Sequence, residues 1–211
     1  MAETSSTFEL KRGAQAPDFD LPVGGMKKRQ TLEDLSEGND VLVVIFACNH
    51  CPYVIHLADS IGEVAKDYDK EPVQFVAINS NDAGSYPDDS PDLMKDFTKK
   101  HGWKFPYLFD ETQHVAKAYS AACTPDFYVF NKDKALTYAG QFDGSRPGNH
   151  APITGSDLIS AIEATLRTGK ANGVQMRPSL GCNIKWKRRN KPPYARWRKG
   201  GSDAGISDIL S

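Results

Sequence analysis

The sequence predicts an α/β fold in which a β-sheet is covered by helices on both faces. Strands alternate with helices between residues 40 and 121, and a hairpin over 126–139 and a helix over 155–167 follow. Two cysteines, Cys48 and Cys51, directly follow the first buried strand. Open α/β sheets place their ligand sites at the carboxyl ends of strands. At 211 residues the chain has the length of one domain with extensions.

The first half of the chain contains the longest regular patterns. A Gly-Gly pair at 24–25 predicts a hairpin turn, and Thr31 can cap a short helical turn. Apolar, β-branched runs over 40–47 and 73–79 are typical of buried strands. Between them, apolar residues at helical spacing predict a long helix over 51–68.

The second half contains shorter elements. We predict, in chain order, a helix over 92–101, an extended run over 103–109, a helix over 112–121, strands over 126–131 and 135–139, and a helix over 155–167. Residues 168–211 are rich in Gly, Pro, Lys and Arg and show little periodicity. We therefore expect a flexible N-terminus over 1–9, one domain over 10–187, and a basic, flexible tail over 188–211.

Composition and termini limit the class of protein. Four cysteines are too few for a disulfide scaffold at this length. The N-terminus lacks the basic start and apolar core of a secretory signal, and no stretch approaches the roughly 20 apolar residues of a membrane span. We therefore expect a cytoplasmic protein without a membrane partner. In that compartment a Cys-x-x-Cys pair is catalytic or binds a metal.

The setting of the two cysteines predicts a redox site. Cys48 and Cys51 stand between a strand and a helix, where unpaired N–H groups and the helix dipole stabilise a thiolate. The thiolate is the nucleophile of thiol–disulfide exchange, and a nearby second thiol resolves the mixed disulfide. His50 lies between them, and a charged imidazole would favour the thiolate. Pro52 suits the first position of a helix.

Five segments together resemble the thioredoxin-fold redoxins of the peroxiredoxin-like subgroup. They read APDFDL, FACNHCPYV, CTPDFYVFN, GQFDGSRPG and RPSLGCNIKWK, and the resemblance covers residues 10–187. It implies a thioredoxin-like fold with a central mixed sheet, to which the sequence adds the N-terminal hairpin extension and the C-terminal basic tail predicted above. It also implies that the Thr124–Pro125 bond is cis and faces the dithiol, with the backbone of Thr124 open to an incoming chain.

The sequence departs from peroxiredoxins at one signature. Their Pro-x-x-x-Thr-x-x-Cys motif has Val44 here in place of the proline and Cys48 in place of the threonine. The chain thus combines the resemblance to a peroxiredoxin with a thioredoxin-like dithiol. We expect a thiol–disulfide oxidoreductase in which Cys48, the more exposed cysteine, attacks, and Cys51, one helical turn further in, resolves.

Two other functions stay open. In a thiol peroxidase, Cys48 or Cys51 would become a sulfenic acid that another cysteine resolves. In a metal-binding module, the pair would form half of a zinc-type site, which needs two further ligands. No second close cysteine pair exists in the sequence, so we assign no metal ligands.

Three further residues belong to the predicted site, each with an alternative. Cys123 is either a third redox cysteine or a small buried apolar residue. Cys182 either resolves a sulfenic acid or packs against the domain. Arg146 either approaches the site and stabilises a thiolate or a peroxide oxygen, or pairs with a surface carboxylate.

The expected partners follow from this chemistry. No cofactor is required, because a reductant such as thioredoxin or another dithiol supplies electrons and a disulfide or hydroperoxide accepts them. Trp186, Tyr194 and Trp197 alternate with basic residues and could stack on bases. That stretch is short, so we expect no nucleic acid. A homodimer stays open, because many peroxiredoxin-like chains dimerise.

Overall fold

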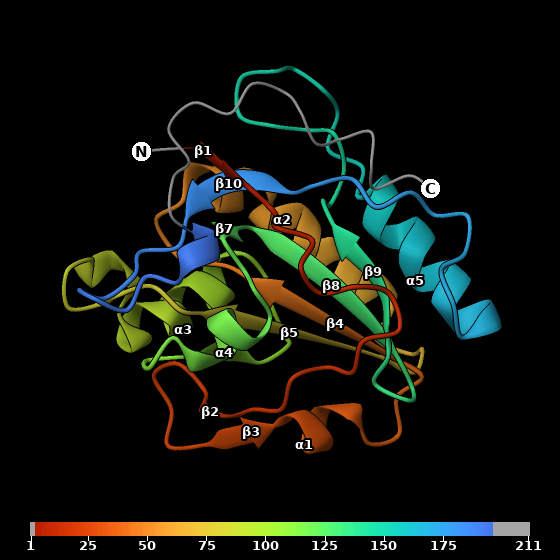
Figure 1. Cartoon of the computed structure of the whole chain (residues 1–211), viewed down its shortest axis with the longest axis horizontal. Helices are drawn as coiled ribbons and strands as arrows, with labels where there is room; N and C mark the ends of the chain where they lie inside the picture. The colour runs from red at the N-terminus through yellow and green to blue at the C-terminus, as the bar shows by residue number, and fades with distance from the viewer. Residues whose placement is uncertain (1–2, 196–211) are drawn as a thin grey trace.

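A five-stranded mixed sheet forms the centre of the computed structural model, which describes residues 3–195 (Figure 1). The strand order is β6-β5-β4-β8-β9, with β4, β5 and β6 parallel and β8 antiparallel to both of its neighbours. The strands are β4 (Val41–Phe46), β5 (Val73–Asn79), β6 (Tyr107–Phe109), β8 (Asp126–Asn131) and β9 (Leu136–Gly140). The predicted α/β class is confirmed.

Helices cover both faces of this sheet. They are α1 (Leu32–Ser36), α2 (Pro52–Asp67), α3 (Pro91–Lys100), α4 (His114–Ala118) and α5 (Ser156–Thr168), with short 3₁₀ helices η1 (Pro87–Asp89) and η2 (Pro193–Ala195). In β4, Val43 and Ile45 pack against α2 and α5, whereas Leu42 and Val44 face α1 and α4 (Figure 1). Every residue of β4 is buried because helices lie on both faces.

The predicted boundaries of the long elements hold to within two residues, but α4 is shorter than expected. We predicted a helix over 112–121, and only His114–Ala118 is helical. Gln113 precedes it in the left-handed conformation with φ of 62°, and Ser120 has φ of 53°. Neither backbone conformation continues a right-handed helix. Of the extended run predicted over 103–109, only Tyr107–Phe109 (β6) forms a strand.

The predicted N-terminal hairpin is present. It consists of β2 (Asp20–Pro22) and β3 (Arg29–Thr31), which pair antiparallel. Thr31 caps α1 as predicted: its hydroxyl accepts from the Asp34 N–H at 3.0 Å, and the Asp34 carboxylate accepts from the Thr31 N–H at 3.0 Å. This reciprocal pair satisfies two backbone donors at the helix start.

A second sheet was not predicted, and it brings residues 3–5 beside residues 180–183. Its order is β1 (Glu3–Ser5), β10 (Leu180–Asn183) and β7 (Cys123–Thr124), all antiparallel. The prediction of a flexible segment over 1–9 is therefore wrong for residues 3–5. Their backbone groups pair with β10, a contact between ends of the chain that no local pattern reveals.

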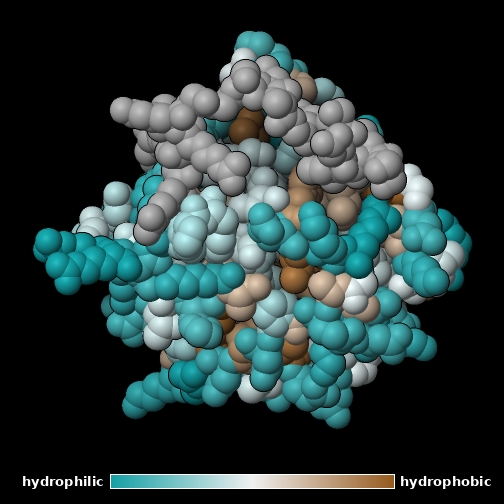
Figure 2. Space-filling view, in the orientation of Figure 1, coloured by the Kyte–Doolittle hydropathy of each residue, from teal (hydrophilic) through white to brown (hydrophobic). Residues whose placement is uncertain are grey.

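The beginning of the predicted flexible tail also packs on the domain. The Tyr194 hydroxyl donates to the Ala116 carbonyl at 3.2 Å, and the Asn190 amide donates to Gln113 Oε1 at 2.8 Å. Residues 196–211 of the predicted tail, with Trp197, lie outside the described residues. On the face shown in Figure 2, hydrophilic side chains dominate. Within residues 3–195, no helix is long and apolar enough to cross a membrane.

Candidate active site

Helix α2 begins directly after the second cysteine. Cys51 is the N-cap of α2 and Pro52 its first residue, where the missing proline N–H costs no hydrogen bond. We predicted that Cys51 lies one turn inside the helix; it lies instead at the helix boundary. Cys48 lies in the loop between β4 and α2.

A cis peptide bond faces both cysteines. The Thr124–Pro125 bond is cis, as the resemblance implied. Cys48 Sγ lies 3.4 Å from the Thr124 hydroxyl, and Cys51 Sγ lies 3.2 Å from the Thr124 carbonyl oxygen. Both sulfur atoms therefore contact the same residue, Thr124.

The two sulfur atoms are enclosed. We predicted that Cys48 is the more exposed cysteine; it is 1% exposed and Cys51 is 0% exposed, so the difference is negligible and both side chains are buried. The backbone of Thr124 is not open either, because β10 pairs with β7 and places Cys182 opposite Thr124. The chain itself occupies the edge that we predicted to receive an incoming chain.

A buried carboxylate lies beside Cys48. Asp89 is 0% exposed and accepts from the Asn49 N–H at 2.8 Å and from the Asn81 amide at 2.7 Å. Its second oxygen lies 2.7 Å from His50 Nδ1. The Asn79 amide holds the Asp89 carbonyl at 3.0 Å. The sequence analysis missed Asp89, although its place in a polar loop after a buried strand was a signal.

His50 is held between Asp89 and an aromatic ring. Its imidazole stacks on Tyr86, with ring centroids 5.7 Å apart and an interplanar angle of 3°. Lys185 Nζ lies 5.8 Å from the centre of the same Tyr86 ring. His50 is therefore fixed beside the dithiol and partly open to solvent, as the side chain is 18% exposed.

The environment separates the pKa values of the two thiols. Burial, the contact with Cys51 and the negative charge of Asp89 raise the pKa of Cys48 well above its usual value. Hydrogen bonds from Cys182 and Cys48, together with the Val54 N–H, lower the pKa of Cys51. Burial of Cys51 opposes this effect but does not outweigh the hydrogen bonds. The first thiolate therefore forms on Cys51, not on Cys48 as we predicted.

Three comparisons place the chain among known proteins. A family model described as Redoxin matches residues 11–155. The chain belongs to the redoxin family. This redoxin is similar to an uncharacterized conserved protein from Geobacillus kaustophilus (46% identity, TM-score 0.84, covering 89% of this chain and 97% of that chain). Among curated proteins, none matches it.

Two further solved structures are similar to this redoxin. A hypothetical protein from Sinorhizobium meliloti 1021 shares 42% identity, with a TM-score of 0.83 and coverage of 87% of this chain and 98% of that chain. A putative thiol:disulfide interchange protein DsbE from Chlorobium tepidum shares 23% identity, with a TM-score of 0.59 and coverage of 75% and 99%. The latter supports the fold alone, and the thioredoxin-like fold is confirmed.

The two other cysteines of this redoxin differ in position. Cys182 lies opposite Thr124, and its sulfur contacts Cys51, which raises the pKa of Cys182. Cys123 is fully buried, and its Sγ lies 3.9 Å from the Ser179 carbonyl oxygen. Burial raises the pKa of Cys123. Of these two candidates, the structure brings Cys182 to the dithiol.

Arg146 is engaged in its own loop. Its guanidinium donates to the carbonyl oxygens of Asp143 at 2.7 Å and Ser145 at 2.6 Å, and also to Gln141 Oε1. It lines a small surface depression together with Pro125. These guanidinium hydrogen bonds all go to residues 141–145. Its role at the site stays a prediction.

Three side chains at the site could hold a metal ion. Ligand atoms of Cys48, His50 and Asp89 lie within 4.8 Å of one another. Thiolate, imidazole and carboxylate form a donor set that suits zinc. Both Asp89 oxygens already accept hydrogen bonds from Asn49 and Asn81, so a metal would compete with these donors.

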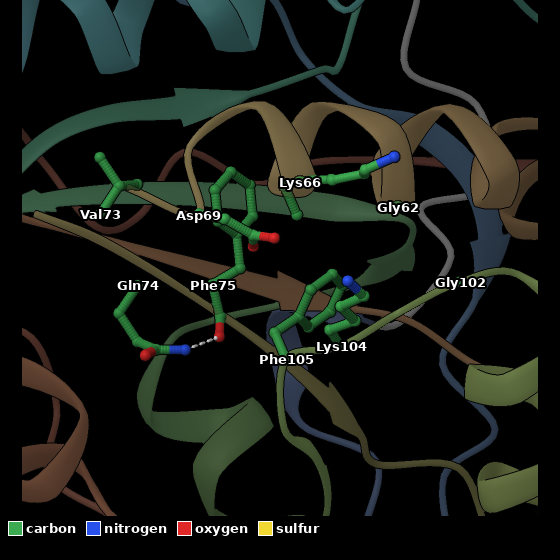
Figure 3. Close-up of a pocket in the computed structure, with 10 residues that line it drawn as sticks. Gly62, Lys66, Asp69, Val73, Gln74, Phe75, Gly102, Lys104 and Phe105 are labelled. Atoms are coloured by element: carbon green, nitrogen blue, oxygen red, sulfur yellow. Dashed lines mark hydrogen bonds between the residues drawn. The ribbon is translucent and has the colours of Figure 1, made fainter. Parts of the chain in front are cut away.

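One surface pocket is remote from the cysteines (Figure 3). It has a volume of about 190 Å³ and is lined by Gly62, Ala65, Lys66, Asp69, Val73, Gln74, Phe75, Gly102, Lys104 and Phe105. Val73 begins β5 and pairs with Val41 at the start of β4, whereas Cys48 follows the end of β4. The pocket therefore lies at the opposite end of the sheet from the dithiol.

Replacing Asp89 with asparagine should make Cys48 more acidic. The substitution removes the negative charge that raises the Cys48 pKa but preserves the shape of the side chain. We expect the pH profile of Cys48 alkylation, followed by mass spectrometry, to move to lower pH. Asp88→Asn is the matched control, because the exposed Asp88 contacts the site only through its carbonyl. An unchanged Asp89→Asn profile would contradict this account of the site.

A buried carboxylate next to Pro125 should make stability depend on pH. Burial raises the pKa of Asp126 to about 6, although hydrogen bonds from Ser6 and Tyr128 act to lower this pKa. Because the folded state then holds the proton more tightly, stability should fall as the pH rises from about 4 to about 6, by about 3 kcal/mol. Urea unfolding of Asp126→Asn should lack this fall, whereas the exposed Asp133→Asn should retain it.

Proposed function

We propose that this redoxin is a thiol–disulfide oxidoreductase with a Cys48–Cys51 redox pair. The observation that carries the proposal is that both sulfurs, at the start of α2, contact Thr124 beside the cis Thr124–Pro125 bond; the lowered pKa of Cys51 agrees with it. A thiolate that is stable at neutral pH beside a second thiol is what dithiol exchange requires. Membership of the redoxin family supports the same chemistry.

The site supports a two-step reaction. Cys48 attacks a substrate disulfide, its proton passes to Asp89 or His50, and one substrate thiolate leaves. The Cys51 thiolate then attacks the Cys48 sulfur of the mixed disulfide, which forms the Cys48–Cys51 bond and releases the second substrate thiolate. A dithiol reductant, of which thioredoxin is an example, restores both thiols. The Cys51 sulfur is packed between the Thr124 carbonyl and Cys182 of β10, whereas Cys48 lies beside the partly exposed His50, so we assign the first attack to Cys48.

Turnover of a disulfide substrate tests this proposal. Insulin reduction in the presence of dithiothreitol should be accelerated by the wild-type chain and not by Cys48→Ser. Cys123→Ala is the control, because that cysteine lies away from the dithiol and should leave the rate unchanged. If the wild type accelerates neither insulin nor a small disulfide such as oxidised glutathione, the proposal fails.

A thiol peroxidase is the second candidate. The observation in its favour is the Thr124 hydroxyl, 3.4 Å from Cys48 Sγ, which can donate to a peroxide oxygen at that sulfur. Against it stands the departure from the peroxiredoxin signature, in which Val44 and Cys48 replace the proline and the threonine. Stopped-flow oxidation by hydrogen peroxide, followed by mapping of the sulfenic acid, separates the two reactions.

A metal-binding module is the third candidate, supported by the Cys48, His50 and Asp89 cluster. It predicts that the purified, reduced chain retains about one zinc ion per molecule and loses it in Cys48→Ser. The hydrogen bonds already made by Asp89 favour the redox function instead.

A further inference from the structure

Strand β10 is fitted closely against the cis-proline segment. Gly181 has no side chain, and a Cβ atom there would lie 2.0 Å from the Thr124 carbonyl oxygen. β10 can therefore reach Thr124 only because glycine occupies this position. The next residue along β10 is Cys182, which is 3% exposed and belongs to the same buried cluster as Cys48 and Cys51.

The register of this sheet directs Cys182 toward the dithiol. Directly opposite residues of antiparallel strands place their side chains on the same face. Cys182 is opposite Thr124, whose hydroxyl contacts Cys48 Sγ. Cys123 precedes Thr124 in β7, so its side chain points to the other face of the sheet. The third sulfur at the site is that of Cys182, and it contacts Cys51.

We propose that Cys182 is a third redox-active thiol, which exchanges with Cys51 after the Cys48–Cys51 disulfide has formed. This inference rests on the proposed function, which supplies that disulfide from a disulfide substrate. In this inference, β10 covers the site and also supplies a cysteine to the reaction cycle.

The exchange is balanced without a further oxidant. The Cys182 thiolate attacks Cys51 Sγ along the Cys48–Cys51 bond. The Cys51–Cys182 bond forms, the Cys48–Cys51 bond breaks, and Cys48 leaves as a thiolate that takes up the proton lost by Cys182. The protein stays oxidised by two electrons throughout.

This step would return the Cys48 thiol beside Asp89 and His50 while the disulfide moves to β10. The new bond would also tie β10 to the start of α2. Cys182 is 3% exposed and Cys48 is 1% exposed, so the transfer does not bury the disulfide more deeply.

Disulfide mapping of the full chain tests the inference. The reduced protein is oxidised with limiting oxidised glutathione, quenched with acid, alkylated and digested. We expect about one tenth or more of the oxidised wild type to carry Cys51–Cys182. In Cys48→Ser, Cys51–Cys182 should be the main product. Cys48→Ser combined with Cys182→Ala should instead retain glutathione on Cys51.

The alternatives give different products. A wild type with only Cys48–Cys51, together with a Cys48→Ser variant that keeps glutathione on Cys51, would overturn the role of Cys182 and leave the proposed function intact. Absence of any Cys48–Cys51 disulfide in the wild type and in Cys182→Ala would overturn the proposed function itself. Cys123→Ala should give the wild-type products, and loss of Cys51–Cys182 in that variant would also contradict the assignment.

Discussion

The Cys51→Ser variant is expected to retain the substrate as a mixed disulfide on Cys48. In the proposed reaction Cys48 attacks first, and the Cys51 thiolate is required to release the second half of the substrate. Without that thiolate the mixed disulfide persists, and insulin turnover should fall by about 10³-fold or more. Incubation with oxidised glutathione and intact-mass measurement should show one adduct, which peptide mapping should assign to Cys48.

The reciprocal variant determines which sulfur reacts first. Cys48→Ser should lose turnover to the same extent, because both thiols act as one unit. No adduct should form at position 48 of this variant, and Cys51 should react slowly because its sulfur is packed against Thr124 and Cys182. If instead Cys51 of Cys48→Ser reacts with glutathione, to an adduct or onward to Cys51–Cys182, as fast as Cys51→Ser forms its adduct, Cys51 is the attacking thiol and the assigned order is reversed.

The sequence was sufficient for the parts of this site that depend on local order. A buried β-branched strand, two cysteines and an amphipathic run place the thiols at the start of α2. The strand and the helix can each be recognised from the spacing of their apolar residues. Pro125 followed from the resemblance, and its cis bond is present. These features require only neighbouring residues in the chain.

The parts that depend on tertiary contacts were not predicted. Asp89 reaches Cys48 because the loop after β5 folds back and is held by Asn79 and Asn81. Burial of Cys48, its contact with Cys51 and that carboxylate raise the Cys48 pKa, and the hydrogen bonds from Cys182 and Cys48 lower that of Cys51, so the expected pKa order is reversed. The enclosure of the dithiol depends on β10, whose few residues carry no strand periodicity. A short strand that is defined by its partner gives no signal of its own.

Gly181→Ala should be the most destabilising of the small substitutions near the site. The added Cβ would lie 2.0 Å from the Thr124 carbonyl oxygen and 2.7 Å from its carbon, and backbone atoms cannot move aside as a flexible side chain can. Either β10 or the cis-proline segment must shift. We expect a loss of about 3 kcal/mol in the free energy of unfolding by urea, at the upper end of the cost of overpacking.

Gly144→Ala is the matched control, because its added Cβ meets no atom within 4 Å. Its stability should stay within about 0.5 kcal/mol of the wild type. Since the shift in Gly181→Ala displaces the neighbouring Cys182, that variant should also form less Cys51–Cys182 while it still forms Cys48–Cys51. A decrease in the free energy of unfolding of less than about 1 kcal/mol would mean that β10 is not held against Thr124 in solution. The conclusion that β10 encloses the dithiol would then be wrong.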